Sequence, residues 1–280
     1  MKMKEKMPEK SYAWSKSIVT ILKLGGSAIT RKEKQSTPNT GVIERLASEI
    51  KKANIKPLII VHGGGSMGHP VAKNFGIKEG YRSPAQLVGF SKTHYAMVKL
   101  NELILDALIR RGLPAVSIQP SASVMTENGR ILTMETKPLL RLLELGCIPV
   151  LYGDAVLDTS LGFTILSGDQ LASNLAVNLN ASRIVIGVDV DGVYTADPKL
   201  DPTARLVKQL SLGELRKLKT KIGVSRAPDV TGGMLGKVSE LIPAIEVEVP
   251  IIIVNATKPN RVYKALKGEK VVGTVITAGE

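Results

Sequence analysis

Residues 58–70 read LIIVHGGGSMGHP and contain the feature that decides the fold. The apolar run 58–61 is typical of a buried parallel strand, and Pro70 favours the first turn of a helix. A glycine-rich turn between a strand and a helix presents backbone N–H groups at the positive end of the helix dipole. The stretch therefore predicts a phosphate-binding site. His69 stands at its end, where it can contact the molecule that carries the phosphate.

Two other interpretations of this turn remain open. Gly63, Gly65 and Gly68 have the dinucleotide-binding spacing G-x-G-x-x-G, which also requires an acidic residue at the end of the next strand, about 20 residues on. Residues 78–82 read KEGYR and do not end a strand. A purely structural turn is the second interpretation, although three consecutive glycines exceed what a turn requires.

Length and composition limit the classes of protein to which this chain can belong. The chain has 280 residues, of which 44% are hydrophobic, and this is enough for a packed core. The single cysteine, Cys147, cannot form an intrachain disulfide and favours a reducing, cytoplasmic compartment. Residues 1–17 are charged and predict an N-terminal extension rather than a secretory signal. We expect no membrane attachment, because no apolar run reaches the ~18 residues of a span.

The formal net charge of +13 raises nucleic acid as a possible partner. The basic residues are scattered, however, and do not form a segment interleaved with aromatic side chains. We therefore expect no nucleic-acid partner, and we interpret the charge as that of a protein that handles several phosphates at once.

Apolar runs of strand length alternate with segments of helical period, which predicts an α/β fold. The expected architecture is a three-layer αβα sandwich with a mostly parallel open sheet. A β-hairpin over 155–166 divides a first lobe, 18–166, from a second lobe, 167–280, on one continuous sheet. Strands are expected at 18–24, 58–61, 115–119, 150–152, 183–188 and 251–254, and helices at 41–53, 84–111, 137–145, 170–179 and 236–245.

Two lysines lie beside glycine pairs. Lys23 ends an apolar strand before Gly25 and Gly26, at the edge where open α/β sheets bind ligands. Lys237 follows Gly232 and Gly233, and we expect it in the first turn of a helix, where it opposes the helix dipole unless an anion is bound. The alternative for both lysines is an ordinary solvated side chain.

Two acidic segments complete this set. In Ser167-Gly168-Asp169, either Ser167 or Asp169 caps the following helix, or the Asp169 carboxylate holds nearby lysines in place. The segment 189–198, DVDGVYTADP, either wraps a nucleoside or forms an ordinary turn. The chain lacks G-x-x-x-x-G-K-[ST], so the inventory indicates a kinase without a P-loop. Phosphoryl transfer needs positioning and charge neutralisation more than covalent chemistry.

Four motifs together resemble the amino acid kinase superfamily over about residues 18–276. They are K-x-G-G-S at 23–27, H-G-G-G at 62–65, D-G-V-Y-x-x-D-P at 191–198 and T-G-G-M-x-x-K at 231–237. Gly68-His69 after the glycine run is similar to the isopentenyl phosphate kinases. Acetylglutamate, glutamate, carbamate and UMP kinases lack this histidine, whereas fosfomycin kinases share it.

The resemblance implies that ATP and isopentenyl phosphate give isopentenyl diphosphate and ADP, as in isoprenoid biosynthesis. It implies Mg²⁺ as the phosphate counter-ion, bound mainly through the nucleotide without metal ligands from the protein. It also implies a homodimer that pairs through the first lobe. No general base is required, because a phosphate monoester oxygen is already an anion.

The resemblance also assigns roles to residues of this chain. Lys23 and Lys237 stabilise charge on the transferred phosphoryl group, Asp169 orients both lysines, and His69 hydrogen-bonds the acceptor phosphate. The substrate-binding set is Gly64, Gly65, Gly68, His69, Gly153 and Asp154. The nucleotide-binding set is Lys23, Gly25, Gly26, Ser27, Lys32, Asp189, Gly192, Tyr194, Asp197, Pro198, Gly232, Gly233 and Lys237.

An isoprenyl tail needs apolar walls, and residues 67–88 are rich in them. The side chains expected to form these walls are Met67, Val71, Phe75, Ile77, Tyr81, Leu87 and Val88. His94, on the long helix that follows, is expected to pack or face solvent rather than bind a ligand. Two alternatives remain: a kinase of fosfomycin or another small phosphate or phosphonate, with a polar pocket, and a nucleotide-dependent binding protein without turnover.

Overall fold

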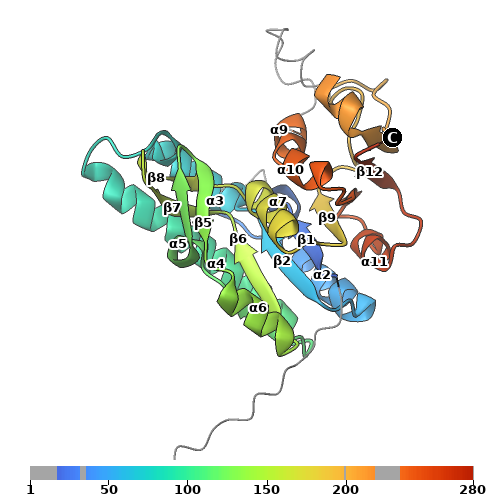
Figure 1. Cartoon of the computed structure of the whole chain (residues 1–280), viewed down its shortest axis with the longest axis horizontal. Coiled ribbons are helices and arrows are strands. Elements are labelled where there is room, and N and C mark those ends of the chain that lie inside the picture. The colour runs from blue at the N-terminus through green and yellow to red at the C-terminus, as the bar shows by residue number, and fades with distance from the viewer. Residues whose placement is uncertain (1–17, 32–35, 199, 218–233, 280) are drawn as a thin grey trace, which may run out of the picture.

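The structure is a computed structural model that describes residues 18–31, 36–198, 200–217 and 234–279 (Figure 1). Its main sheet has eight strands in the order β10-β12-β11-β9-β1-β2-β6-β3, and a second sheet has the order β5-β4-β7-β8. The main strands are β1 (Thr20–Leu24), β2 (Leu58–His62), β3 (Ala115–Ser117), β6 (Ile148–Tyr152), β9 (Arg183–Val188), β10 (Gln209–Ser211), β11 (Ile251–Asn255) and β12 (Gly273–Thr277). The smaller sheet contains β4 (Val124–Glu127), β5 (Arg130–Met134), β7 (Asp154–Asp158) and β8 (Gly162–Leu166).

Helices connect these strands. Figure 1 shows α9, α10 and α11 at one end of the molecule and the four-stranded sheet at the other. The helices are α1 (Gly26–Ile29), α2 (Thr40–Ala53), α3 (Gly65–Asn74), α4 (Ala85–Ile109), α5 (Pro120–Ser123), α6 (Lys137–Glu144), α7 (Gly168–Asn178), α9 (Met234–Ser239), α10 (Ile242–Glu246) and α11 (Arg261–Lys267).

The main sheet is covered on both faces, so the expected three-layer αβα architecture is confirmed. Adjacent residues of β1 point to opposite faces: Ile21 belongs to the core cluster that includes residues of α6, α7, α9 and α10, whereas Leu22 belongs to the cluster that includes residues of α2, α4 and α11. All its strand pairs are parallel except β11–β12. Burial on both faces explains why β1, β2 and β9 are almost continuously apolar in sequence.

The register of β1 positions the site. Leu24, the last residue of β1, is aligned with His62 in β2 and with Gly187 in β9. Because the three strands are parallel, the turns that follow them emerge at one edge of the sheet. Residues on either side of position 166 contribute strands to this sheet, and the division into two functional lobes stays a prediction.

The helix expected to begin at Pro70 begins five residues earlier, at Gly65, so that expectation is wrong. Proline lacks an N–H group, and within a helix it leaves the carbonyl of residue i−4 without its usual donor. Here that carbonyl belongs to Ser66, and it accepts a hydrogen bond from Ser36 N at 3.0 Å instead. A loop contact from outside the helix therefore replaces the missing bond.

The helix expected over 236–245 is divided into α9 and α10. Pro243 lies in the first turn of α10, where its missing N–H is tolerated, but it could not continue the ladder of α9. Lys237 is the fourth residue of this six-residue helix and so lies in its last turn, where the dipole favours a positive charge. The β4–β5 hairpin, β10, β12 and α11 were not expected from the sequence.

None of the helices in the described ranges has both the length and the apolar character needed to cross a bilayer.

Candidate active site

Two glycine turns, one after β1 and one after β2, are in contact at the edge of the sheet. A Cβ atom added to Gly26 would lie 2.1 Å from Gly65 N, and one added to Gly65 would lie 2.5 Å from Gly26 O. Gly65 also has φ +49°, which side chains disfavour. Only glycine permits this approach, so the two turns face one shared space.

In the turn after β2, some backbone N–H groups are used within the protein and others have no acceptor among the described residues. Gly63 N donates to Leu24 O and Gly68 N donates to Gly64 O, whereas Gly64 and Gly65 donate no backbone hydrogen bond to any described residue. Gly68 lines the cavity, and its N–H already donates to Gly64 O at 3.3 Å, so its role as a phosphate donor stays a prediction.

The turn after β1 also contains backbone N–H groups without an acceptor. Within the described ranges, the N–H groups of Gly26 and Ser27 have no acceptor, and the buried Oγ of Ser27 has no partner. Unpaired N–H groups at the start of a helix form an anion site. The two turns therefore provide two adjacent sets of donors suited to two phosphate groups.

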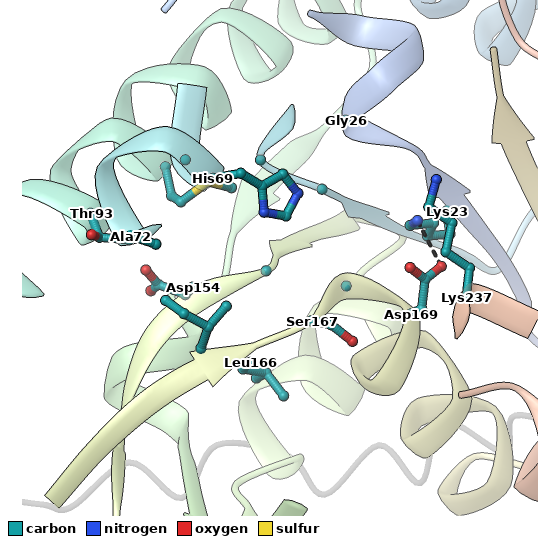
Figure 2. Close-up of a pocket in the computed structure, with 17 residues that line it drawn as sticks. Lys23, Gly26, His69, Ala72, Thr93, Asp154, Leu166, Ser167, Asp169 and Lys237 are labelled. Atoms are coloured by element: carbon teal, nitrogen blue, oxygen red, sulfur yellow. Dashed lines mark ion pairs between the residues drawn. The ribbon is translucent and has the colours of Figure 1, made fainter. Parts of the chain in front are cut away.

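A cavity of about 230 Å³ runs between these turns and the start of α7. Figure 2 shows Lys23, Asp169 and Lys237 grouped on one side, with Ala72, Thr93 and Asp154 on the other and His69 between them. The residues that line it are Lys23, Gly26, Gly63, Gly64, Gly68, His69, Ala72, Thr93, Met97, Gly153, Asp154, Ile165, Leu166, Ser167, Gly168, Asp169 and Lys237. The cavity thus joins a charged end to a mainly apolar end.

A buried ion pair stands at the charged end. Lys23 Nζ lies 2.7 Å from Asp169 Oδ1, and the side chains are 3% and 11% exposed. Ser167 caps α7 by accepting a hydrogen bond from Gln170 N, which leaves Asp169 in the first turn, at the positive end of the helix dipole. The sequence left open whether Asp169 caps α7 or holds a lysine. In the structure Ser167 is the cap, and Asp169 holds Lys23.

The surroundings of His69 lower the pKa of its imidazole and so favour the neutral form. Its ring is exposed to the open cavity, but the surrounding walls withdraw it from bulk water, and this desolvation lowers its pKa. The positive charges of Lys237 and Lys23 lower it further, and Asp169 opposes them. A neutral imidazole beside an anion site has one N–H to donate.

Asp154 forms part of the cavity wall, and protein groups occupy its carboxylate. Both oxygens lie 3.0 Å from His94 Nδ1, and Ser121 N and Ala155 N also donate to them. Burial raises the pKa of Asp154, and the His94 imidazole opposes that shift. His94, expected to be a packing or surface residue, thus binds a protein group. Gly153 allows close packing, since a Cβ there would lie 3.0 Å from Gly168 N.

The segment after β9 folds onto the neighbouring strand ends. Val193 N donates to Thr274 Oγ1 at 2.8 Å, and Asn255 Nδ2 donates to Asp191 Oδ1 at 3.0 Å. This segment lies at the same sheet edge but does not line the cavity, and it holds five of the expected nucleotide-binding residues: Asp189, Gly192, Tyr194, Asp197 and Pro198. Lys32, Gly232 and Gly233 lie outside the described residues.

The walls at the apolar end differ from those expected. Met67 is buried in the core beside α2 and α4, whereas Tyr81, Leu87 and Val88 are exposed. None of the seven expected side chains lines the cavity; Ala72, Met97, Ile165 and Leu166 do. Thr93 and Met97 have the i, i+4 spacing of one helix face, which was the only sequence signal for them.

Met97 also supports the glycine turn. Cβ atoms added to Gly64 and Gly68 would lie 2.7 and 2.8 Å from Met97 Sδ. The sulfur atom therefore fills the space that side chains at these positions would take, and the same side chain forms part of the apolar wall.

His62, before the glycine run, is fully buried and supports the site from behind. Its ring stacks on Tyr152 with centroids 5.3 Å apart, and its Nε2 lies 3.2 Å from Asn101 Oδ1. Burial lowers the pKa of His62 to about 4. The imidazole is therefore neutral in the folded protein over a pH range in which an unfolded histidine is charged.

This shift predicts acid sensitivity of folding. The unfolded state binds one more proton than the folded state between the ordinary pKa of 6.5 and the folded value of about 4. The contribution of His62 to the free energy of unfolding is fully present above pH 6.5. It falls by roughly 3 kcal/mol on acidification to pH 4. Urea unfolding at pH 7.5 and 4.5 should give a larger loss for the natural chain than for His62→Gln. Equal losses would contradict this account.

Comparisons with known proteins identify the family of this chain. Residues 19–255 match the family model described as the amino acid kinase family. The chain is 43% identical to the isopentenyl phosphate kinase of Methanothermobacter thermautotrophicus, over 92% of this chain and 98% of that one. It is 31% identical to the isopentenyl phosphate kinase of Arabidopsis thaliana, over 91% and 92% of the two chains.

Solved structures lead to the same family. A crystal structure of an isopentenyl phosphate kinase superposes with a TM-score of 0.82 at 41% identity, covering 92% of this chain and all of that one. The product complex of the enzyme from T. acidophilum gives 0.75 at 30% identity, with 92% and 99% covered. The chain therefore belongs to the amino acid kinase family and, within it, to the isopentenyl phosphate kinases.

Proposed function

We propose that this chain transfers the γ-phosphoryl group of ATP to isopentenyl phosphate, giving isopentenyl diphosphate and ADP in isoprenoid biosynthesis. The observation that carries the proposal is a cavity whose charged end, lined by Gly26 and Gly64 with their unpaired N–H groups, continues into a mainly apolar end. A small alkyl phosphate needs both ends at once. Full-length relatives named isopentenyl phosphate kinase support the same acceptor.

The open donors divide naturally between the two substrates. Gly64 and Gly65 face the acceptor phosphate, and His69 donates a hydrogen bond to it. Gly26 and Ser27 face the ATP phosphates, with the segment 189–198 beside the nucleoside. We assign the lobe before residue 167 to the acceptor and the lobe after it to the nucleotide.

Charge at the transferred group is balanced by Lys23 and Lys237. Lys23 is held by Asp169 at 2.7 Å, so its ammonium needs no reorganisation when charge develops during transfer. Direct in-line attack by an acceptor oxygen needs no general base, because that oxygen is already anionic. The protein thus supplies orientation and electrostatic stabilisation.

We also propose Mg²⁺ as the counter-ion of the ATP phosphates, coordinated mainly by their oxygens, which hard cations prefer. When bound, it adds positive charge at the transferring phosphoryl group. The open N–H groups and the buried Ser27 Oγ fit the phosphates that would carry it. Within the described ranges, no three His, Cys, Asp or Glu side chains are grouped as metal ligands.

We also propose a cytoplasmic location, which is expected from the single cysteine of the chain.

A homodimer formed through α4 is the proposed assembly. The outer surface of α4 carries exposed apolar side chains, including Leu87, Val88 and Tyr95, which are 51%, 56% and 58% exposed. Exposed apolar groups of this kind on one element favour a protein interface.

The acceptor is tested by ADP release with Mg²⁺-ATP and four candidates: isopentenyl phosphate, dimethylallyl phosphate, geranyl phosphate and fosfomycin. We expect isopentenyl phosphate to have the highest kcat/KM, because the cavity ends in Ala72, Met97, Ile165 and Leu166. Preference for fosfomycin would overturn the acceptor and leave the fold intact. ATP binding without turnover on any of the four would favour the binding-protein alternative.

Two variants separate the roles of His69 and Lys237. Loss of a hydrogen bond to a charged group costs about 10- to 100-fold, so His69→Ala should lower kcat/KM for the acceptor by this factor while ATP affinity is kept. Lys237→Ala should lower kcat by about 100-fold or more, since its charge acts mainly in the transition state. Steady-state kinetics with each substrate varied checks both. Unchanged KM and kcat for His69→Ala, or near-normal kcat for Lys237→Ala, would refute the respective role.

Light scattering should give the mass of a dimer for the natural chain. The double variant Val88→Glu/Tyr95→Glu places charge on α4 and should shift the mass to that of a monomer. Leu145→Glu, at a residue 65% exposed after α6, is the matched control and should stay dimeric. A monomeric natural chain, or a dimer in all three proteins, would argue against pairing through α4.

A further inference from the structure

The hydroxyl of Thr30 lies between the two glycine turns and has no place in the roles described above. Thr30 is 2% exposed. Its Oγ1 donates to Gly26 O at 2.7 Å and accepts from Ser66 N at 2.9 Å. One buried hydroxyl therefore bonds the backbone of the turn after β1 to the turn after β2.

Ser66 is bound through both of its backbone groups. It is the second residue of α3, so its N–H has no partner within the helix and would otherwise be open, like those of Gly64 and Gly65. Thr30 Oγ1 accepts this N–H, and Ser36 N donates to the carbonyl that Pro70 leaves free. The start of α3 is thus attached to the segment that follows α1.

Thr30 itself is held firmly in place. Its own N–H donates to Gly26 O at 2.9 Å, it forms a β-bridge with Pro38, and Asn39 N donates to Ile29 O beside it. Thr30 does not line the cavity. It can therefore act on the substrates only through the positions of the two turns.

We propose that Thr30 is a positioning residue that sets the separation and orientation of the two phosphate-binding turns. By engaging Ser66 N, its hydroxyl also leaves Gly64 and Gly65 as the open donors of the second turn. This inference rests on the proposed function, which assigns one turn to ATP and the other to the acceptor. In-line transfer is sensitive to such geometry, since a displacement of about 1 Å can cost 100-fold in rate.

The test compares Thr30→Val with Thr30→Ser. Valine keeps the shape but removes both hydroxyl bonds, whereas serine keeps them. Thr20→Val is the matched control, because Thr20 is a buried threonine at the opposite end of β1 with a bond to Ser182 Oγ. Kinetics with each substrate varied, normalised to folded protein, and thermal unfolding are measured for all four proteins.

Thr30→Val should lose about 10-fold or more in kcat, with both KM values within about threefold of the natural chain. Thr30→Ser and Thr20→Val should stay within about threefold in kcat, even where they lower the unfolding temperature. If Thr30→Val does not fold, Thr30→Ala takes its place.

Three results would overturn the inference while the natural chain is active: normal kcat without the hydroxyl, an equal loss in Thr30→Ser, or a change in the KM values alone. A natural chain that is inactive on every acceptor would instead refute the proposed function, and the role of Thr30 with it.

Discussion

The contact between the backbones of Gly26 and Gly65 is the constraint on which the site depends. It exists because β1 lies between two parallel partners in a register that ends all three strands at one edge. Parallel strands are about 4.8 Å apart, so turns that leave adjacent strands must either diverge or touch. Here they touch, and 2.1 Å from Gly65 N to a Cβ at position 26 leaves room for hydrogen only. The sheet therefore brings the two sets of donors side by side, and the bonds of Thr30 then act on turns that are already in contact.

The charges at this edge of the sheet depend on the burial of Lys23. Lys23 is almost inaccessible to water, and a lone buried ammonium would be costly; the Asp169 carboxylate, whose own charge is favoured at the positive end of the α7 dipole, offsets that cost. Desolvation lowers the pKa of His69, the charges of Lys237 and Lys23 lower it further, and Asp169 opposes them. The positive charge of the site thus lies on the lysines, and the lowered pKa of His69 favours its neutral form, which can donate one N–H hydrogen bond.

Sequence reasoning succeeded where the signal is local. The glycine run, Lys23 at a strand end and the cap at Ser167 are each defined by a few consecutive residues, and the alternation of strands and helices predicted the sandwich. The prediction of the side chains that form the apolar walls was wrong. The side chains found there include Ala72, Met97 and Ile165, which come from α3, α4 and β8, and only the packing of the smaller sheet brings them together. Pro70 was misleading because Ser36 replaces the bond that a helical proline loses. Thr30 carried no signal, since its partner Ser66 lies 36 residues away.

The position of Met97 has a consequence for how acceptor range can evolve. Its sulfur supports the glycine turn at Gly64 and Gly68, and the same side chain closes part of the apolar end. A smaller residue at 97 would lengthen the space for a tail and at the same time withdraw packing from the turn that presents donors to the phosphate. With the acceptor bound as proposed, tail length and phosphate affinity are linked traits, and selection for a longer acceptor must act on both ends of the molecule that it binds.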